Sequence, residues 1–290
     1  MPAAFLTEIR QAITNLNPNE VREVAERPLS IGLVAPTQDI LWQIESFLCP
    51  PELSLAKRAE ISSMIHRNAL SRDHEKHDVE IYDASVLRPK RAFPFDPDNP
   101  QRTVRQILDR HPELALPLSR HFPPFRQPVV RQIVHKVARE NALFSLATAL
   151  PDILPSLLSL PWAVGEFASD TAFLTMNQIR MSFLLAAASD RDLGYREQKT
   201  EVASIIAGAF GWRSLARELI GKIPLGGGLL PKAAVAYSGT YVEGVSLERL
   251  YRIGYGLTRE ERRTAYREAF HRGKQIAETL LETLRRRQAV

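Results

Sequence analysis

One turn near the start of the chain has the setting in which nucleotide-binding proteins hold phosphate. It follows an expected buried strand at 29–35 and precedes an expected helix at 38–48. A phosphate loop needs glycines whose N–H groups surround the phosphate, a Lys that neutralises it, and a Ser or Thr that holds Mg²⁺. The four diagnostic positions of this turn are occupied by Ala35, Ile40, Leu41 and Trp42. None of these side chains can do that chemistry, so we expect no cofactor and no binding of GTP or ATP.

Asp83 is the one candidate for catalytic chemistry. It ends a second expected strand at 78–83, where a GTPase holds the Asp that is linked to its Mg²⁺, but Ala84 follows in place of the usual Gly. The chain has no Asn-Lys-x-Asp motif for guanine and no Ser/His/Asp or Cys/His signature, and Cys49 is expected to be a core residue at a helix end. We therefore predict a non-enzymatic protein without catalytic residues. The alternative is a hydrolase or nucleotide-dependent enzyme that uses Asp83 in an unrecognised site.

A histidine-rich stretch at 66–78 resembles a metal site only superficially. It holds His74 and His77 beside Asp73 and Asp78, but their spacing matches no zinc motif and the surrounding residues are polar. We expect a solvated loop and no bound metal.

A basic segment is the third chemically distinctive feature. From residue 117 to residue 139 there are five Lys or Arg, two His and no acid. On a helix expected at 127–150, a basic row lies opposite an apolar face. We predict that this segment contacts an anionic membrane surface or a partner protein through Arg126, Arg131, His135, Lys136 and Arg139. The alternative is a soluble bundle in which Arg126, Arg131 and Arg139 pair with acids of the last helix, such as Glu260, Glu261 and Glu268.

The most apolar part of the chain, 141–168, follows directly. Three prolines interrupt it, and its longest uncharged run is 153–165, so no clean membrane span is expected. A buried helical core is predicted, with a membrane-contacting hairpin as the alternative. A helix expected at 170–190 carries Arg180 in mid-segment, which needs a carboxylate partner if it is buried. The sequence candidates for that partner are Asp152, Glu166 and Asp170.

Glycine is concentrated late in the chain, since 11 of the 14 glycines fall between residues 194 and 256. Glycine costs a helix about 1 kcal/mol relative to alanine, so a compensating close approach of helices is expected. Small side chains recur every four residues at Ala236, Thr240 and Gly244, which predicts a face for close helix packing. A glycine turn at 226–228 is expected to precede this helix.

These features require two kinds of scaffold. Strands at 29–35, 78–83 and 92–95, with helices at 38–48 and 55–69, predict a small α/β domain with a parallel sheet over residues 1–100. A proline-rich linker at 94–100 leads to a larger all-helical domain, 101–290, which ends in a charged helix opened by a capping box at 258–261. The fold class is therefore α+β and mostly α, with a degenerate α/β domain before a glycine-rich, close-packed helical domain.

From about residue 123 to residue 255 the chain resembles the YcjF-like helical domain of unknown function. The resemblance is carried by ALPDILPSLLSLPWAVGEFASDTAFLTMNQIRM and by LARELIGKIPLGGGLLPKAAVAYSGTYVEG, which contains Gly-Thr-Tyr-x-x-Gly. That domain is found in some bacterial membrane proteins and after the GTPase domain of Era-like proteins. The resemblance implies an association with membranes and GTPases, and it makes the N-terminal part look like a degenerate GTPase domain.

These observations together predict a membrane-proximal interaction or scaffold protein. No apolar run of signal-peptide length begins the chain, so we expect a cytoplasmic protein that lies peripherally on the inner face of the membrane. The expected partners are an anionic bilayer, a partner protein such as a GTPase, or a second copy of the chain. The basic residues lack interleaved aromatic residues or a known motif, so no nucleic acid is expected.

Overall fold

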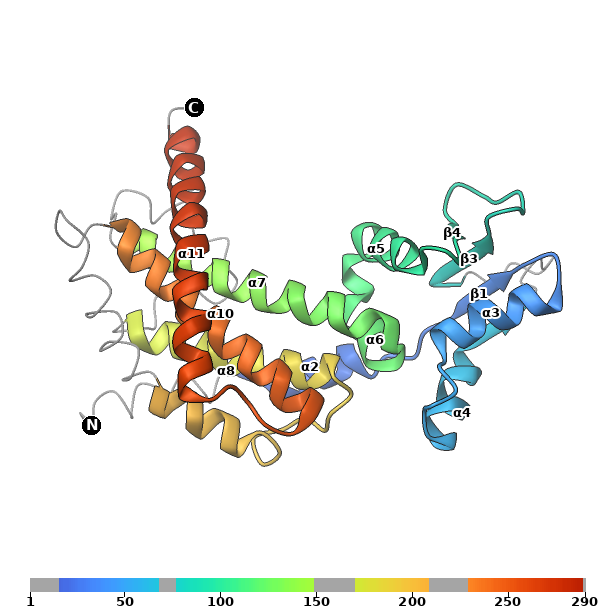
Figure 1. The fold of residues 1–290 in the computed structure, drawn as a ribbon, viewed down its shortest axis with the longest axis horizontal. Coiled ribbons are helices and arrows are strands. Elements are labelled where there is room, and N and C mark those ends of the chain that lie inside the picture. Colours follow the sequence, from blue (N-terminus) through green and yellow to red (C-terminus); the bar gives the residue numbers. More distant parts are fainter. Residues whose placement is uncertain (1–15, 68–76, 149–169, 209–228, 289–290) are drawn as a thin grey trace. The chain divides into compact units, whose positions relative to one another are not determined.

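The computed structural model describes residues 16–67, 77–148, 170–208 and 229–288, which are mostly helical with one small parallel sheet, as predicted (Figure 1). The chain forms two compact units. One comprises Glu20–Arg131 and Ala187–Arg191, and the other comprises Met1–Asn19, Gln132–Ala186 and Asp192–Val290. Helices α7 (Pro123–Ala147) and α8 (Asp170–Ala188) contribute residues to both units. We call these the sheet unit and the helical unit.

The sheet unit is built on four parallel strands in the order β2-β1-β3-β4. Every residue of β1 (Ile31–Val34) and of β3 (Val79–Asp83) is buried, as expected for parallel strands covered on both faces. Helix α3 (Gln38–Leu48) follows β1 at the predicted position, and its start is capped by the Thr37 hydroxyl, which accepts a hydrogen bond from the N–H of Ile40. The short strand β4 (Phe93–Phe95) forms the edge beside β3.

The helix predicted at 55–69 was wrong at residues 65–67. Helix α4 ends at Met64 (Leu55–Met64), and the next residues form strand β2 (Ile65–Arg67), which pairs in parallel with β1. Ile65 lies opposite Ile31 and is buried, whereas the other two residues of β2 are exposed. A single apolar side chain gives no alternating pattern, so the strand depends on pairing with β1 and not on a local signal.

Three further helices complete the sheet unit. They are α2 (Pro18–Ala25), α5 (Pro100–Arg110) and α6 (Ala115–His121), and a 3₁₀ turn at Pro112–Leu114 links the last two. The apolar side of α5 is fully buried at Val104 and Ile107, and it packs next to β4.

The helical unit is organised around α10 (Leu229–Ile253) and α11 (Arg259–Gln288), which pack along each other (Figure 1). Helix α10 is continuous over its 25 residues. The predicted capping box opens α11: the Thr258 N–H donates to Glu261 Oε2, and the Glu261 N–H donates to the Thr258 hydroxyl. The glycine turn predicted at 226–228 lies outside the described residues, as do residues 149–168 of the apolar stretch.

Helix α7 begins at Pro123, four residues earlier than predicted, and keeps Pro128 inside it. Prolines are tolerated in a first helical turn because the N–H groups there have no partner within the helix. Pro123 and Pro124 fall in that first turn and mark the start of the helix, whereas Pro128 lies in the second turn. Within the described residues, no helix is both long and apolar enough to cross a membrane.

Candidate functional site

The predicted basic row occupies the exposed side of α7. Arg131, Lys136 and Arg139 are exposed, and Arg131 donates a hydrogen bond to Gln127 one turn earlier. The opposite side of the helix is buried at Val134, Val137 and Ala138. The cations thus face outward from their own unit and are available to a partner.

His135 lies in this row but is half-buried in an aromatic cluster of the helical unit. Its Nδ1 is 3.0 Å from the Tyr237 hydroxyl, its ring centroid is 5.2 Å from that of Tyr241, and the two tyrosine rings stack at 5.9 Å. The guanidinium of Arg272, from α11, lies over the Tyr241 ring at 5.7 Å. Burial, and then the charges of Arg272 and Arg139, hold the pKa of His135 below its ordinary value. Positive groups from two helices therefore converge on one surface.

Arg126 differs from the rest of the predicted set. It belongs to the sheet unit, where its guanidinium forms an ion pair with Asp190 at 3.0 Å and donates to the carbonyls of Ser119 and Arg120. Burial lowers the pKa of Arg126, and the Asp190 carboxylate opposes that shift. The pairing of Arg126 with acids of the last helix was therefore wrong, and one of those acids, Glu261, pairs with Arg249.

The three small residues of α10 lie at a close approach of helices within the helical unit. Ala236 and Thr240 are buried, and a Cβ placed on Gly244 would lie 2.7 and 2.8 Å from the two methyl carbons of Val134 on α7. The same Cβ would lie 3.1 Å from the sulfur of Met181 on α8. Two neighbouring helices thus approach the backbone of α10 at this glycine.

Thr240 also belongs to a polar network inside this core. Its hydroxyl accepts hydrogen bonds from Asn141 at 2.7 Å and from Gln178 at 3.2 Å, and Asn177 donates to the side chain of Asn141 at 2.8 Å. All four side chains are buried, and each has a hydrogen-bond partner. A network in which every member is paired holds the helices in one register and carries no free group for chemistry.

Two of the partners predicted for Arg180, Asp152 and Glu166, lie outside the described residues, and the structure gives Arg180 a carboxylate partner that was not among the sequence candidates. Its guanidinium pairs with Glu140 of α7 at 2.5 Å and also donates to Asn177 at 2.9 Å. Burial lowers the pKa of Arg180, and Glu140 opposes the shift. Glu140 is the first acid after the acid-free segment, so the sequence did contain a signal for it.

The candidate phosphate turn and Asp83 have structural roles in the sheet unit. Asp83 is buried, and its Oδ1 accepts hydrogen bonds from the N–H of Ser85, at 2.9 Å, and from the Ser85 hydroxyl, which ties the turn after β3. Trp42 is 68% exposed on α3. Cys49 is buried at the C-terminus of α3, as predicted, and burial raises the pKa of its thiol.

The described part of the histidine-rich stretch is tied to the sheet unit. His77 Nδ1 lies 2.8 Å from the Ser30 hydroxyl, and Asp78 holds Arg27 and the N–H of Ser30. Asp73 and His74 lie outside the described residues. Across the described ranges, no group of three or more His, Cys, Asp or Glu side chains could hold a metal ion.

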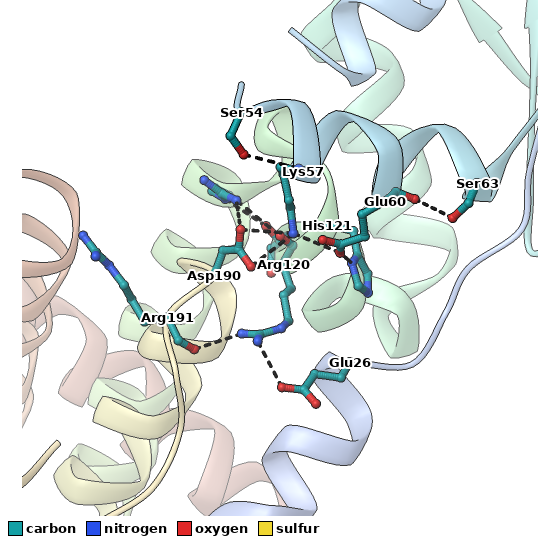
Figure 2. Close-up of polar contacts among 11 residues, drawn as sticks. Glu26, Ser54, Lys57, Glu60, Ser63, Arg120, His121, Asp190 and Arg191 are labelled. Carbon is teal, nitrogen blue, oxygen red and sulfur yellow. Dashed lines mark hydrogen bonds and ion pairs between the residues drawn. The ribbon is translucent and has the colours of Figure 1, made fainter. Parts of the chain in front are cut away.

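A polar cluster that the sequence did not indicate lies within the sheet unit, where α4, α6 and the end of α8 meet (Figure 2). Lys57 of α4 donates to Glu60 at 3.0 Å and to Asp190 at 3.1 Å. On α6, Arg120 pairs with Glu26 at 3.0 Å, and His121 Nδ1 lies 2.7 Å from Glu60 Oε1. Burial disfavours the charged form of Glu60, but hydrogen bonds from Lys57 and His121 outweigh it and leave the pKa of Glu60 below its ordinary value.

This cluster borders a cavity of about 370 Å³ whose lining includes Glu26, Glu60, Arg120, His121 and Asp190. His121 is 6% exposed, and its Nε2 is buried without a hydrogen-bond partner among the described residues. A carboxylate that orients one imidazole nitrogen and leaves the other without a partner is an arrangement suited to binding or proton transfer. The two residues are 61 positions apart, and no spacing in the sequence connects them.

Comparisons of the chain with protein-family models, with curated proteins and with solved structures give no match.

Proposed function

We propose that this protein is a non-enzymatic, membrane-proximal protein that attaches to an anionic bilayer surface through the basic face of the helical unit, formed by Lys136 and Arg139 of α7 and Arg272 of α11. The observation that carries the proposal is the convergence of Arg139 and Arg272 on His135. Their charges lower the pKa of that histidine, and no acid contributes to the shift. Within the described residues, none of the three cations forms a salt bridge, so their charge is available to a partner.

This face suits attachment to the surface of an anionic leaflet better than insertion into the bilayer. The apolar side of α7 is covered by its own unit, and Tyr237 is fully buried. Attraction between Lys or Arg and an anionic leaflet contributes about 1 kcal/mol per residue and is screened within a Debye length. The attachment is therefore peripheral, reversible and sensitive to salt. Binding to a GTPase stays a prediction from the resemblance, and binding to a second copy of the chain also stays a prediction.

Flotation of the full chain with liposomes tests the proposal. Recovery is expected with vesicles that contain phosphatidylglycerol and not with pure phosphatidylcholine, and it should fall as salt rises. The triple variant Lys136→Ala, Arg139→Ala, Arg272→Ala should bind about 100-fold more weakly, since three contacts of about 1 kcal/mol are lost.

A matched control removes three exposed cations elsewhere in the helical unit: Arg196→Ala, Lys199→Ala and Arg259→Ala. Arg259 lies 13 residues from Arg272 on α11, about 20 Å along the helix. Equal recovery on both kinds of vesicle, or an equal loss in the control variant, would refute attachment through this face.

A further inference from the structure

The orientation of His121 is determined by the carboxylate beside it. His121 ends α6, and its Nδ1 lies 2.7 Å from Oε1 of Glu60, which lies near the middle of α4 (Figure 2). A carboxylate accepts hydrogen bonds and does not donate them, so Nδ1 carries the proton. In the neutral ring Nε2 then holds a lone pair and acts as an acceptor. Leaving such a buried atom without a partner costs stability, and a ligand with a donor group would offset that cost.

The cavity around His121 is rich in acceptors. Three carboxylates and one guanidinium line it, and Lys57 and Arg126 beside it pair with Glu60 and Asp190, so each carboxylate has a cationic partner. Both oxygens of Asp190 are already engaged, one with Lys57 and the other with Arg126. Glu26 and Glu60 are engaged through Oε1, and among the described residues no donor reaches the Oε2 atom of either. The unengaged groups at this cavity are thus one imidazole lone pair and two carboxylate oxygens.

This set of groups selects the chemistry of a ligand. An anion would be repelled by the two unengaged carboxylate oxygens, and the neighbouring cations Arg120 and Lys57 already pair with carboxylates. A metal ion would need more His, Cys, Asp or Glu side chains together than the described residues bring to one place. A cation with N–H donors can donate a hydrogen bond to the imidazole lone pair, and the carboxylate oxygens can balance its charge. A volume of about 370 Å³ is at the small end for ligand sites.

We propose that the cavity of the sheet unit bounded by His121, Glu60 and Glu26 binds a small organic cation with a primary ammonium group, which donates a hydrogen bond to Nε2 of His121. Glu60 orients the imidazole, and the free oxygens of Glu26 and Glu60 balance the charge of the ammonium. Arg120 holds Glu26 in place through their ion pair. This site is separate from the basic face of the helical unit, because its residues all belong to the sheet unit.

The test titrates the full chain, labelled with ¹⁵N in its histidine side chains, with 1,4-diaminobutane. We expect a saturable change of the His121 Nε2 resonance, assigned by its loss in a His121→Asn variant. Butan-1-ol and sodium butyrate, which have similar carbon chains but no positive charge, should leave the resonance unchanged. A response to butyrate would show an anion site, and no saturable response to the diamine would refute the proposal.

Two substitutions of one residue separate the roles of the two nitrogens. The amide N–H of His121→Asn takes the place of Nδ1 and keeps the bond to Glu60, but it leaves nothing at Nε2. His121→Gln places an amide oxygen near the Nε2 position and loses the Nδ1 bond. Calorimetry should show binding of 1,4-diaminobutane weakened about tenfold or more in His121→Asn and less in His121→Gln. Glu26→Gln, at a side chain that is 47% exposed, is the variant to use if both substitutions disturb folding, and it should also weaken binding. Unchanged affinity in His121→Asn or in Glu26→Gln would overturn the assignment.

Discussion

The close approach of helices at Gly244 predicts that even one added methyl group destabilises the helical unit. In Gly244→Ala the new Cβ would lie 2.7 and 2.8 Å from the methyl carbons of Val134 and 3.1 Å from the sulfur of Met181. Favourable contacts between carbon atoms lie at about 3.5–4.0 Å, so α7 and α10 would have to separate. Such overpacking costs about 1–3 kcal/mol, whereas replacing a helical glycine by alanine gains about 1 kcal/mol in propensity. A net loss of about 1 kcal/mol is expected, and several for Gly244→Leu.

A double-mutant cycle isolates the contact from other effects. Val134→Ala removes both methyl carbons nearest to the new Cβ and leaves only the flexible side chain of Met181. Val134→Ala alone should destabilise by creating a cavity, but combined with Gly244→Ala it should cost at least about 1 kcal/mol less than the two changes added together. Ala203→Gly, at an exposed helical position, measures the helix propensity of glycine in this chain.

Urea denaturation followed by circular dichroism measures the free energy of unfolding of each variant. The values are compared with one common slope of free energy against urea concentration. Strict additivity of Gly244→Ala and Val134→Ala would show that the two residues do not press on each other. An unchanged midpoint for Gly244→Leu would refute the close packing of α7 and α10 altogether.

Other perturbations test the ion pairs and the helix cap. Glu140→Gln should lower the free energy of unfolding by about 3 kcal/mol, because Arg180 is 17% exposed and would keep its charge without the carboxylate; adding Arg180→Met should restore part of the loss in the same urea assay. Asp190→Gly relieves a positive φ of 59° but removes the acceptor of two cations. We expect the melting temperature to fall from wild type to Asp190→Asn and further to Asp190→Gly, with smaller differences in 1 M NaCl. A glycine variant as stable as the wild type would show that these ion pairs contribute nothing. Thr258→Ala removes the cap of α11 and should cost about 1 kcal/mol. Arg249 and the cap lower the pKa of Glu261 from 4.5 to about 2. The contribution of Glu261 to stability is therefore fully present above pH 4.5 and is lost as the pH falls towards 2. Melting temperatures measured across this range should fall less steeply in Thr258→Ala than in the wild type, and an equal slope would contradict this assignment.

The sequence predicted those elements whose signal is local. Strand β1 is a continuous apolar run, because a parallel strand is buried on both faces, and α3 lies between a capping Thr37 and a pair of prolines. The capping box of α11 was likewise complete within four residues. Strand β2 escaped prediction because it has one buried residue, Ile65, and is specified by pairing with a strand 34 positions earlier. The start of α7 was misplaced because Pro123 and Pro124 fall in the first turn, where they do not interrupt a helix.

The polar contacts were harder to predict than the elements, for a physical reason. A buried cation such as Arg180 needs a carboxylate, and that much follows from its apolar neighbours. Which carboxylate it finds depends on how two helices are placed, and Glu140 is 40 positions away. The spacing of Ala236, Thr240 and Gly244 indicated a packing face, but not that α7 and α8 supply its neighbours or that Thr240 joins a polar network.

The Glu60–His121 cavity lies beyond sequence reasoning because its two distinguishing features break local rules. Asp190 has a backbone conformation that favours glycine, and it is the one non-glycine residue with positive φ in the described part of the chain. His121 keeps a buried nitrogen without a partner. Each costs stability, and such departures in natural proteins concentrate where a protein binds or reacts. Both residues border the same cavity within one unit, although 69 positions separate them in the chain. Two independent costs at one place are more simply explained by a ligand that uses the cavity than by two unrelated defects of packing.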